Sequence, residues 1–188
     1  MPAAPPKPRV QWPERLERIQ SQRIVERQGE EIIPHEHMRI ERTSYQHGSV
    51  TTFAHSIRVA CLSIWLADRM HLWDRVDQRA LVRSALLHDY FLYDWHEWDN
   101  GTHRLHGLTH GQTALLNASR DFQLGGVERD SIARHLFPLT PIPPKYLEGY
   151  IVSLADKISA TRETLSPTRF KRRKRYARHS RRSRMSRA

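Results

Sequence analysis

The sequence Ala-Leu-Leu-His-Asp at residues 85–89 is the most informative stretch of this chain. It places an imidazole and a carboxylate side by side at the end of an apolar run. On a helix with 3.6 residues per turn, two adjacent side chains diverge by about 100°. His88 can then hold one metal ion while the two carboxylate oxygens of Asp89 contact two ions. A His-Asp pair by itself is weak support for a metal site, because so short a motif often occurs by chance.

Further imidazole and carboxylate side chains strengthen this interpretation. They are His55 upstream of the pair and His110, His135 and Asp156 downstream of it. Each of them alone is more simply explained as a core histidine or as a carboxylate with a local hydrogen bond. Burying all of them without a partner would cost several kcal/mol for each unsatisfied or charged group. A divalent cation removes that cost, so the set predicts a metal site.

The ordered pattern H…HD…H…H…D resembles the HD-domain superfamily of metal-dependent phosphohydrolases. The resemblance covers roughly residues 45–165, with 33 positions from His55 to His88 and 67 from Asp89 to Asp156. The segment Ser-Leu-Ala-Asp-Lys at residues 153–157 is similar to the final Asp motif of that family.

The resemblance implies a metal centre with one or two ions. His55, His88, Asp89 and Asp156 would hold the first ion, and Asp89 would bridge to a second ion held by His110 and His135. Mixed nitrogen and oxygen ligands without a thiolate suit Fe, Mn, Co, Ni or Zn.

The second metal position departs from one related pattern. Cyclic-di-nucleotide phosphodiesterases of this superfamily have an additional histidine where this chain has Leu136, and their GYP signature is absent here. His106, four residues before His110, would either fill this position or bind phosphate.

The reaction implied by the resemblance is hydrolysis of a phosphate ester, such as a nucleotide or a related small phosphate. A divalent cation lowers the pKa of a bound water from 15.7 toward about 7, which suits in-line attack on phosphorus. We expect Arg58, His106 and Lys157 to bind the substrate phosphate. Arg58 and Lys157 are equally compatible with solvated helix charges.

The catalytic residues expected from the pattern are Asp89 and a proton donor to the leaving group. Some HD nucleotidases place a glutamate three residues after the HD aspartate, where this chain has Leu92. Asp94 is the expected substitute, with the neighbouring histidines His96, His103 and His106 as alternatives.

The pattern leaves two other functions open. The same four histidines and two aspartates support HD-fold diiron oxygenases, which the spacing does not distinguish from hydrolases. A nucleic-acid-associated regulatory protein is the other alternative, because residues 166–188 contain 11 of the 31 Lys and Arg and none of the 20 acids. Residues 169–187 would attract nucleic acid or another anionic surface without sequence preference.

The fold expected from these patterns is all-α: an HD-domain helical bundle over residues 14–165 with mobile N- and C-terminal extensions. Residues 1–13 contain five prolines, and the basic segment 166–188 is typical of disordered tails. Polar and apolar spacing predicts helices over 14–28, 50–70, 80–88, 109–117, 130–136 and 146–165. One face of the helix over 50–70 is formed by His55, Val59, Leu62 and Leu66, and Asp77 is the expected N-cap of the next helix. Gly125-Gly126 is expected to break the chain between two helices, and the last helix is expected to face inward through Tyr150, Ile151, Leu154, Ala155 and Ile158. Residues 90–107 are expected to form a long loop, and no stretch alternates as a strand would.

The sequence also favours a cytoplasmic protein without a transmembrane segment. The single cysteine, Cys61, excludes a disulfide within the chain, and no apolar run approaches the 18 residues that a bilayer span requires.

Overall fold

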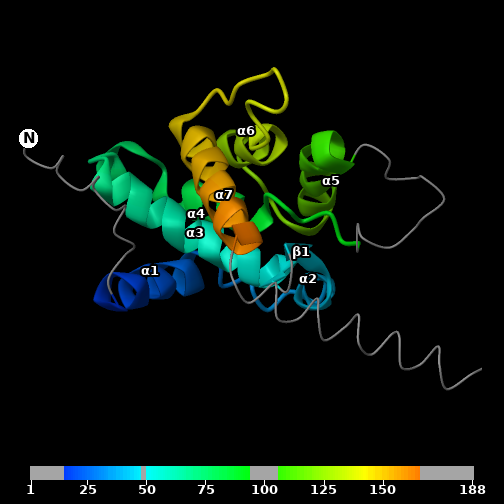
Figure 1. The fold of residues 1–188 in the computed structure, drawn as a ribbon, viewed down its shortest axis with the longest axis horizontal. Coiled ribbons are helices and arrows are strands. Elements are labelled where there is room, and N and C mark those ends of the chain that lie inside the picture. Colours follow the sequence, from blue (N-terminus) through cyan, green and yellow to red (C-terminus); the bar gives the residue numbers. More distant parts are fainter. Residues whose placement is uncertain (1–14, 48–49, 94–105, 166–188) are drawn as a thin grey trace, which may run out of the picture.

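The computed structural model describes residues 15–47, 50–93 and 106–165 (Figure 1). Within these ranges all regular secondary structure is helical apart from a two-stranded antiparallel sheet, so the expected all-α class is confirmed. The predicted extensions 1–13 and 166–188 lie outside the described residues. The elements are α1 (Arg15–Gln28), α2 (Met38–Thr43), β1 (Tyr45–His47), β2 (Val50–Thr51), α3 (Thr52–Arg69), η1 (Trp73–Arg75), α4 (Gln78–Leu87), α5 (His106–Asp121), α6 (Gly126–Arg134) and α7 (Leu147–Leu165).

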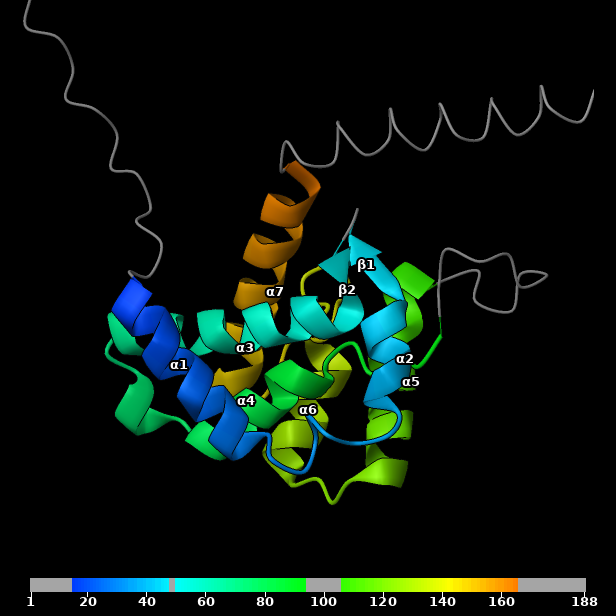
Figure 2. The same ribbon diagram turned by 90° about the horizontal axis from the view of Figure 1, so that it is seen from below.

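Helix α3 is the centre of the bundle. It packs against α1, α4 and α7, while α6 packs against α4, α5 and α7. Helices α1 and α5 lie at opposite ends of the molecule in both ribbon views (Figures 1 and 2). The hairpin of β1 and β2 lies beside the start of α3. This arrangement brings the ends of several helices to one place.

Two side-chain caps fix where the central helices begin. The hydroxyl of Thr51 accepts a hydrogen bond from Ala54 N at the start of α3, and the carboxylate of Asp77 accepts one from Ala80 N at the start of α4. Such caps satisfy backbone N–H groups that the first turn leaves unpaired. Asp77 N in turn donates to Glu148 Oε1 at 2.7 Å, which ties the start of α4 to the first turn of α7.

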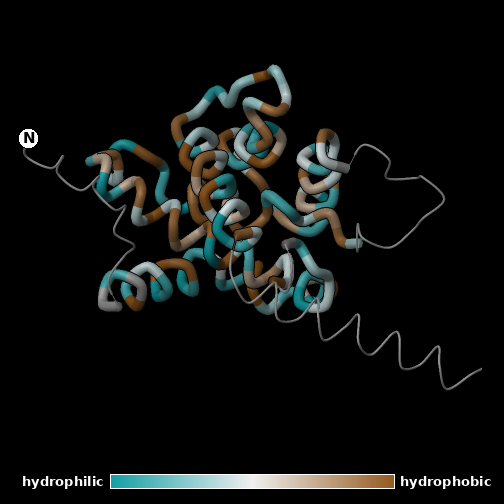
Figure 3. Tube along the Cα trace, viewed as in Figure 1, coloured by the Kyte–Doolittle hydropathy of each residue, from teal (hydrophilic) through white to brown (hydrophobic). Residues whose placement is uncertain are grey.

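The predicted apolar stripe of α3 faces the core. His55, Val59, Leu62 and Leu66 are all buried, as their spacing of three and four residues requires. Apolar and polar residues follow one another at short intervals along the helices of the Cα trace, as expected for helices with one buried face (Figure 3). None of the described helices combines the length and the apolar character needed to cross a bilayer.

The inward face predicted for α7 is only partly correct. Ile151 and Ala155 are buried, but Tyr150 and Leu154 are each 43% exposed. These two residues precede the buried pair by one position, which turns them about 100° away from the core. The residues that begin α7 are apolar on more than one side of the helix, so the sequence did not show which side packs against the core.

Helix α6 begins earlier than predicted. The pair Gly125-Gly126 was expected to separate two elements, with a short helix starting at Asp130. Instead the helix starts at Gly126, and Glu128 Oε2 accepts a hydrogen bond from Gly125 N at 2.5 Å. The prediction was wrong because Gly125 is the N-cap of this helix, and the glutamate in the first turn accepts its backbone N–H.

Two further boundaries differ from the sequence prediction. Helix α5 starts at His106 and ends at Asp121, so it is longer than the predicted 109–117 and includes the end of the predicted loop. The strands β1 and β2 were not predicted at all. They contain three and two residues, which is too short for an alternating pattern to be visible.

Candidate metal centre

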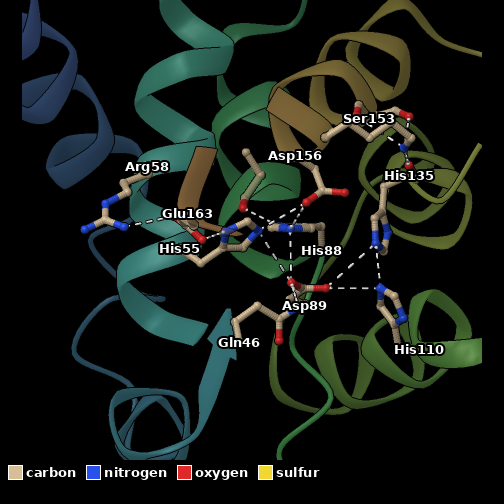
Figure 4. A network of polar contacts seen from close by, with 12 residues as sticks. Gln46, His55, Arg58, His88, Asp89, His110, His135, Ser153, Asp156 and Glu163 are labelled. Carbon is tan, nitrogen blue, oxygen red and sulfur yellow. Dashed lines mark hydrogen bonds and ion pairs between the residues drawn. The ribbon is translucent and has the colours of Figure 1, made fainter. Parts of the chain in front are cut away.

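The six residues predicted as ligands converge on one largely buried centre, although they are far apart in sequence (Figure 4). They form two groups, and within each group one nitrogen or oxygen atom of every residue lies within 4.8 Å of the others. The first group is His55, His88 and Asp156, and the second is Asp89, His110 and His135.

Asp89 connects the two groups because its oxygens point in different directions. Oδ2 lies 3.3 Å from His88 Nε2 and 3.7 Å from His55 Nε2. Oδ1 lies 3.3 Å from His110 Nε2 and 3.8 Å from His135 Nε2. One carboxylate therefore offers a separate oxygen to each group of imidazoles.

The remaining distances are similarly short. Asp156 Oδ1 lies 3.1 Å from His55 Nε2 and 3.8 Å from His88 Nε2. In the second group, the Nε2 atoms of His110 and His135 are 3.1 Å apart. Each of the four histidines thus directs the same ring nitrogen, Nε2, toward the centre.

His88 and His135 are oriented by the same local device at the ends of two helices. Each residue is the C-cap of its helix, α4 or α6. Their Nδ1 atoms lie 2.8 Å from Ala85 O and Ile132 O, the carbonyls three residues earlier. Because a carbonyl only accepts, Nδ1 carries a proton in both rings, and Nε2 is the nitrogen that faces the centre. In each case one hydrogen bond at the end of the helix also directs Nε2 toward the centre.

His55 is oriented by a carboxylate that the sequence analysis did not identify. Its Nδ1 donates to Glu163 Oε2 at 2.9 Å, and Arg58 Nη1 donates to Glu163 Oε1 at 2.9 Å. Glu163 lies on α7, two turns after Asp156, and its residue is 8% exposed. The spacing of seven residues from Asp156 was the available signal, since such residues share a helix face.

A second residue that the sequence analysis missed comes from the segment before α3. Gln46 on β1 is buried and its Nε2 donates to Asp89 Oδ2 at 2.6 Å. An amide donor at this position orients the carboxylate without adding charge. Nothing in the polar stretch around Gln46 marked it in the sequence, because a three-residue strand carries no visible pattern.

Glu41 lies close to the same carboxylate and supports the backbone after it. Burial, together with the negative charge of Asp89, raises the pKa of Glu41 well above its usual value. Glu41 Oε1 accepts a hydrogen bond from Leu92 N at 3.3 Å, where Leu92 has a positive φ of 63°. The contact holds the chain in a conformation that a leucine rarely adopts.

A glycine allows α5 to approach the end of α6. A Cβ atom at Gly111 would lie 3.1 Å from Ala133 O and 3.3 Å from His135 Cε1. A side chain at this position would push α5 away from α6. Because Gly111 directly follows His110, the close approach sets the separation between His110 and His135.

The predicted substrate-binding and catalytic residues are placed as follows. Lys157 Nζ donates to His135 O at 3.0 Å and to Ser153 Oγ at 2.9 Å, next to the second group. The Arg58 side chain is 54% exposed and paired with Glu163. Asp94 lies outside the described residues, and His106 begins α5 but its side chain is not among those described. Their roles in binding and catalysis stay predictions.

The two aspartates carry negative charge despite their burial. Burial raises the pKa of each carboxyl group, but the neighbouring imidazoles outweigh it. The charge of His88 is the strongest of these influences on Asp89, and it holds that pKa well below its usual value. A hydrogen bond from His55 is the strongest for Asp156, whose pKa is lowered to about 2.

The pKa values of His135 and His55 are shifted in opposite directions. Burial, reinforced by the charges of His88 and His110, lowers the pKa of His135 to about 3, so this ring is neutral at pH 7. Burial also lowers the pKa of His55, but hydrogen bonds to Asp156 and Glu163 outweigh it and raise this pKa to about 10. A cation entering the first group would therefore displace a proton from His55.

The polar atoms at the centre fit a divalent transition metal. His88 Nε2 and Asp89 Oδ1 are buried, and no residue in the described part of the chain makes a hydrogen bond to either atom. Buried polar atoms without partners are costly, and native proteins rarely keep them. Four imidazoles and two carboxylates form a donor set that suits Fe, Mn, Co, Ni or Zn better than Ca.

Comparison with known proteins agrees with this geometry. The HD domain family matches residues 52–161, a range that includes all six converging residues. No curated protein and no solved structure matches the chain. Gln46 and Glu163 lie just outside the matched range, so the contacts that orient Asp89 and His55 are supplied from its borders.

Proposed function

The chain belongs to the HD-domain family, whose members are in general metal-dependent phosphohydrolases, and we propose that it hydrolyses a phosphate ester of a nucleotide or a related small phosphate. The observation that carries the proposal is the position of Asp89. Its two oxygens face separate groups of imidazoles at 3.3 Å from the nearest nitrogen of each. This arrangement suits two cations held side by side.

We assign the ligands of the two ions from these groups. His55, His88, Asp89 and Asp156 would hold the first ion, and Asp89, His110 and His135 the second. Divalent cations supply a water of lowered pKa and neutralise charge on phosphoryl oxygens. No cysteine or serine nucleophile is required for such a hydrolysis.

The surrounding residues act by fixing the ligands. Gln46 donates to Asp89 Oδ2 and limits rotation of that carboxylate. Glu163 accepts from His55 Nδ1 and keeps Nε2 directed at the centre, where a bound cation would replace the proton on this nitrogen. Partners of this kind typically change metal affinity or activity by 10–100-fold when they are removed.

The substrate phosphate would meet cations on two sides of the centre. We propose Lys157, Arg58 and His106 as its contacts. Lys157 would exchange one of its present hydrogen bonds for a phosphate oxygen, and burial, which already lowers its pKa, strengthens its attraction to an anion. Asp94 is the proposed proton donor to the leaving oxygen.

The alternative of an HD-fold diiron oxygenase uses the same donor set. We propose a test with the purified full-length chain, reconstituted separately with Mn²⁺, Co²⁺ and Fe²⁺. A phosphohydrolase releases inorganic phosphate from a panel of nucleotides and small phosphate esters under anaerobic conditions. Oxygen uptake that depends on a substrate, together with no phosphate release from any ester, would replace the hydrolase assignment by the oxygenase.

A further inference from the structure

A second cluster of metal-binding side chains lies away from the HD centre. His35 and His37 precede α2, with His37 as its N-cap residue, and Asp121 is the last residue of α5. One nitrogen or oxygen atom from each residue lies within 4.8 Å of the other two. His37 Nδ1 is 2.6 Å from Asp121 Oδ2, and the three residues are half-buried. His35 and His37 fall outside the segment that matches the HD family.

The hydrogen bonds around the cluster keep the three side chains together. Tyr90 Oη donates to Asp121 Oδ2 at 3.0 Å and lies 3.2 Å from His35 Nδ1. His37 N donates to His35 Nδ1 at 3.4 Å, so this nitrogen presents a lone pair. The cluster therefore joins the loop before α2, the end of α5 and the residue that follows the HD pair.

We propose that His35, His37 and Asp121 form a metal site separate from the HD centre, for Zn²⁺ or another transition ion that favours imidazole. Two imidazoles and one carboxylate are a recognised ligand set for zinc, with the fourth position open to water. Calcium and magnesium are unfavoured because they require mostly oxygen ligands.

Two changes accompany binding. The proton shared between His37 Nδ1 and Asp121 Oδ2 leaves to solvent, because a coordinating nitrogen must offer its lone pair. Arg120, which donates to Asp121 at 2.8 and 3.2 Å, turns away from the carboxylate. Its side chain is 58% exposed, so solvent replaces the ion pair at small cost. Arg120 therefore competes with the cation.

The consequence of occupancy is a link between two segments that border the HD centre. The ion would fasten the loop before α2 to the C-terminal end of α5. Helix α2 carries Glu41, which holds Leu92 N, and β1 directly after it carries Gln46, which bonds to Asp89. An ion bound here would therefore stabilise the N-terminal segment that completes the centre.

The test counts zinc ions in the full-length chain. Metal-free wild type and the variants His37→Gln and Asp121→Asn are titrated with Zn²⁺ against a chromophoric chelator. We expect each variant to bind one ion fewer than wild type, and Arg120→Ala to keep the count with about two- to fivefold tighter binding at this site. His71→Asn, which changes an exposed histidine outside the cluster, is the matched control and keeps the count.

The difference between wild type and variants is independent of how many ions the HD centre binds. Equal zinc counts in wild type, His37→Gln and Asp121→Asn would overturn the proposal. Wild type gives a second readout that needs no variant: saturating Zn²⁺ should protect His35 and His37 from diethyl pyrocarbonate, as measured by mass spectrometry. Unchanged modification of both histidines would equally overturn it.

Discussion

Replacing Glu163 by alanine should weaken metal binding at the first group by about 10–100-fold. Glu163 makes two hydrogen bonds of 2.9 Å, to His55 Nδ1 and to Arg58 Nη1, and the one to the buried imidazole fixes the metal-binding nitrogen. A hydrogen bond to a charged group contributes about 1.5–3 kcal/mol. Because each 1.4 kcal/mol is a factor of ten, this range corresponds to the predicted loss.

The assay is competition between the chain and a chelator for Mn²⁺ or Co²⁺, with far-UV circular dichroism as a check on folding. Alanine favours the helix, so α7 should remain intact. Glu163→Gln should show a smaller loss, because the amide oxygen still accepts from Nδ1 while the charge is removed. Arg58→Ala is the control, since it leaves the contact between Glu163 and His55 in place. Metal affinity in Glu163→Ala equal to that of wild type would refute the positioning role of this carboxylate.

Three further predictions concern the second ion, the basic tail and acid stability. His110→Ala or His135→Ala should lower the metal content of the HD centre from about two ions toward one, seen by plasma mass spectrometry as one ion fewer per chain than wild type, because neither belongs to the first group; unchanged content would make these histidines substrate contacts. Deleting residues 168–188 should leave phosphate release intact and abolish salt-dependent retention on a polyanion column; lost hydrolysis would give the tail a catalytic role. Burial raises the pKa of Asp121, but hydrogen bonds from Arg120, His37 and Tyr90 outweigh burial and hold this pKa below its usual value. The ionised carboxylate therefore stabilises the folded chain above about pH 4, and this contribution is lost as the pH falls further. In metal-free buffer the melting temperature of Asp121→Asn should therefore fall less than that of wild type between pH 5 and 3, and parallel curves would contradict this.

The sequence was sufficient for elements with a strong amphipathic pattern. The stripe on α3 and the cap at Asp77 predicted two central helices, because buried apolar spacing and capping are local properties. The start of α6 was missed because its N-cap is a glycine, and the glutamate that accepts the N–H of this glycine lies inside the first turn. Tyr150 and Leu154 were placed on the wrong side of α7, since the packing partners of a largely apolar helix are set by the rest of the fold.

The candidate site divides in the same way. The six converging side chains could be listed from the sequence because their residue types and order resemble the HD superfamily. Gln46 and Glu163 could not, because each acts through a contact between segments 43 and 108 residues apart. The histidines at 35 and 37 lay in a stretch without helical or strand periodicity, and their partner Asp121 is 84 residues from His37.

The most direct test of the metal centre is the activity of Asp89→Ala alongside its metal content. We predict that the HD centre of wild type holds one or two transition-metal ions and that the chain releases phosphate. Asp89→Ala should lose metal from this centre and at least about 100-fold in turnover, since removing even an outer partner of a ligand costs 10–100-fold. Near-normal turnover of a metal-loaded Asp89→Ala chain would contradict the account.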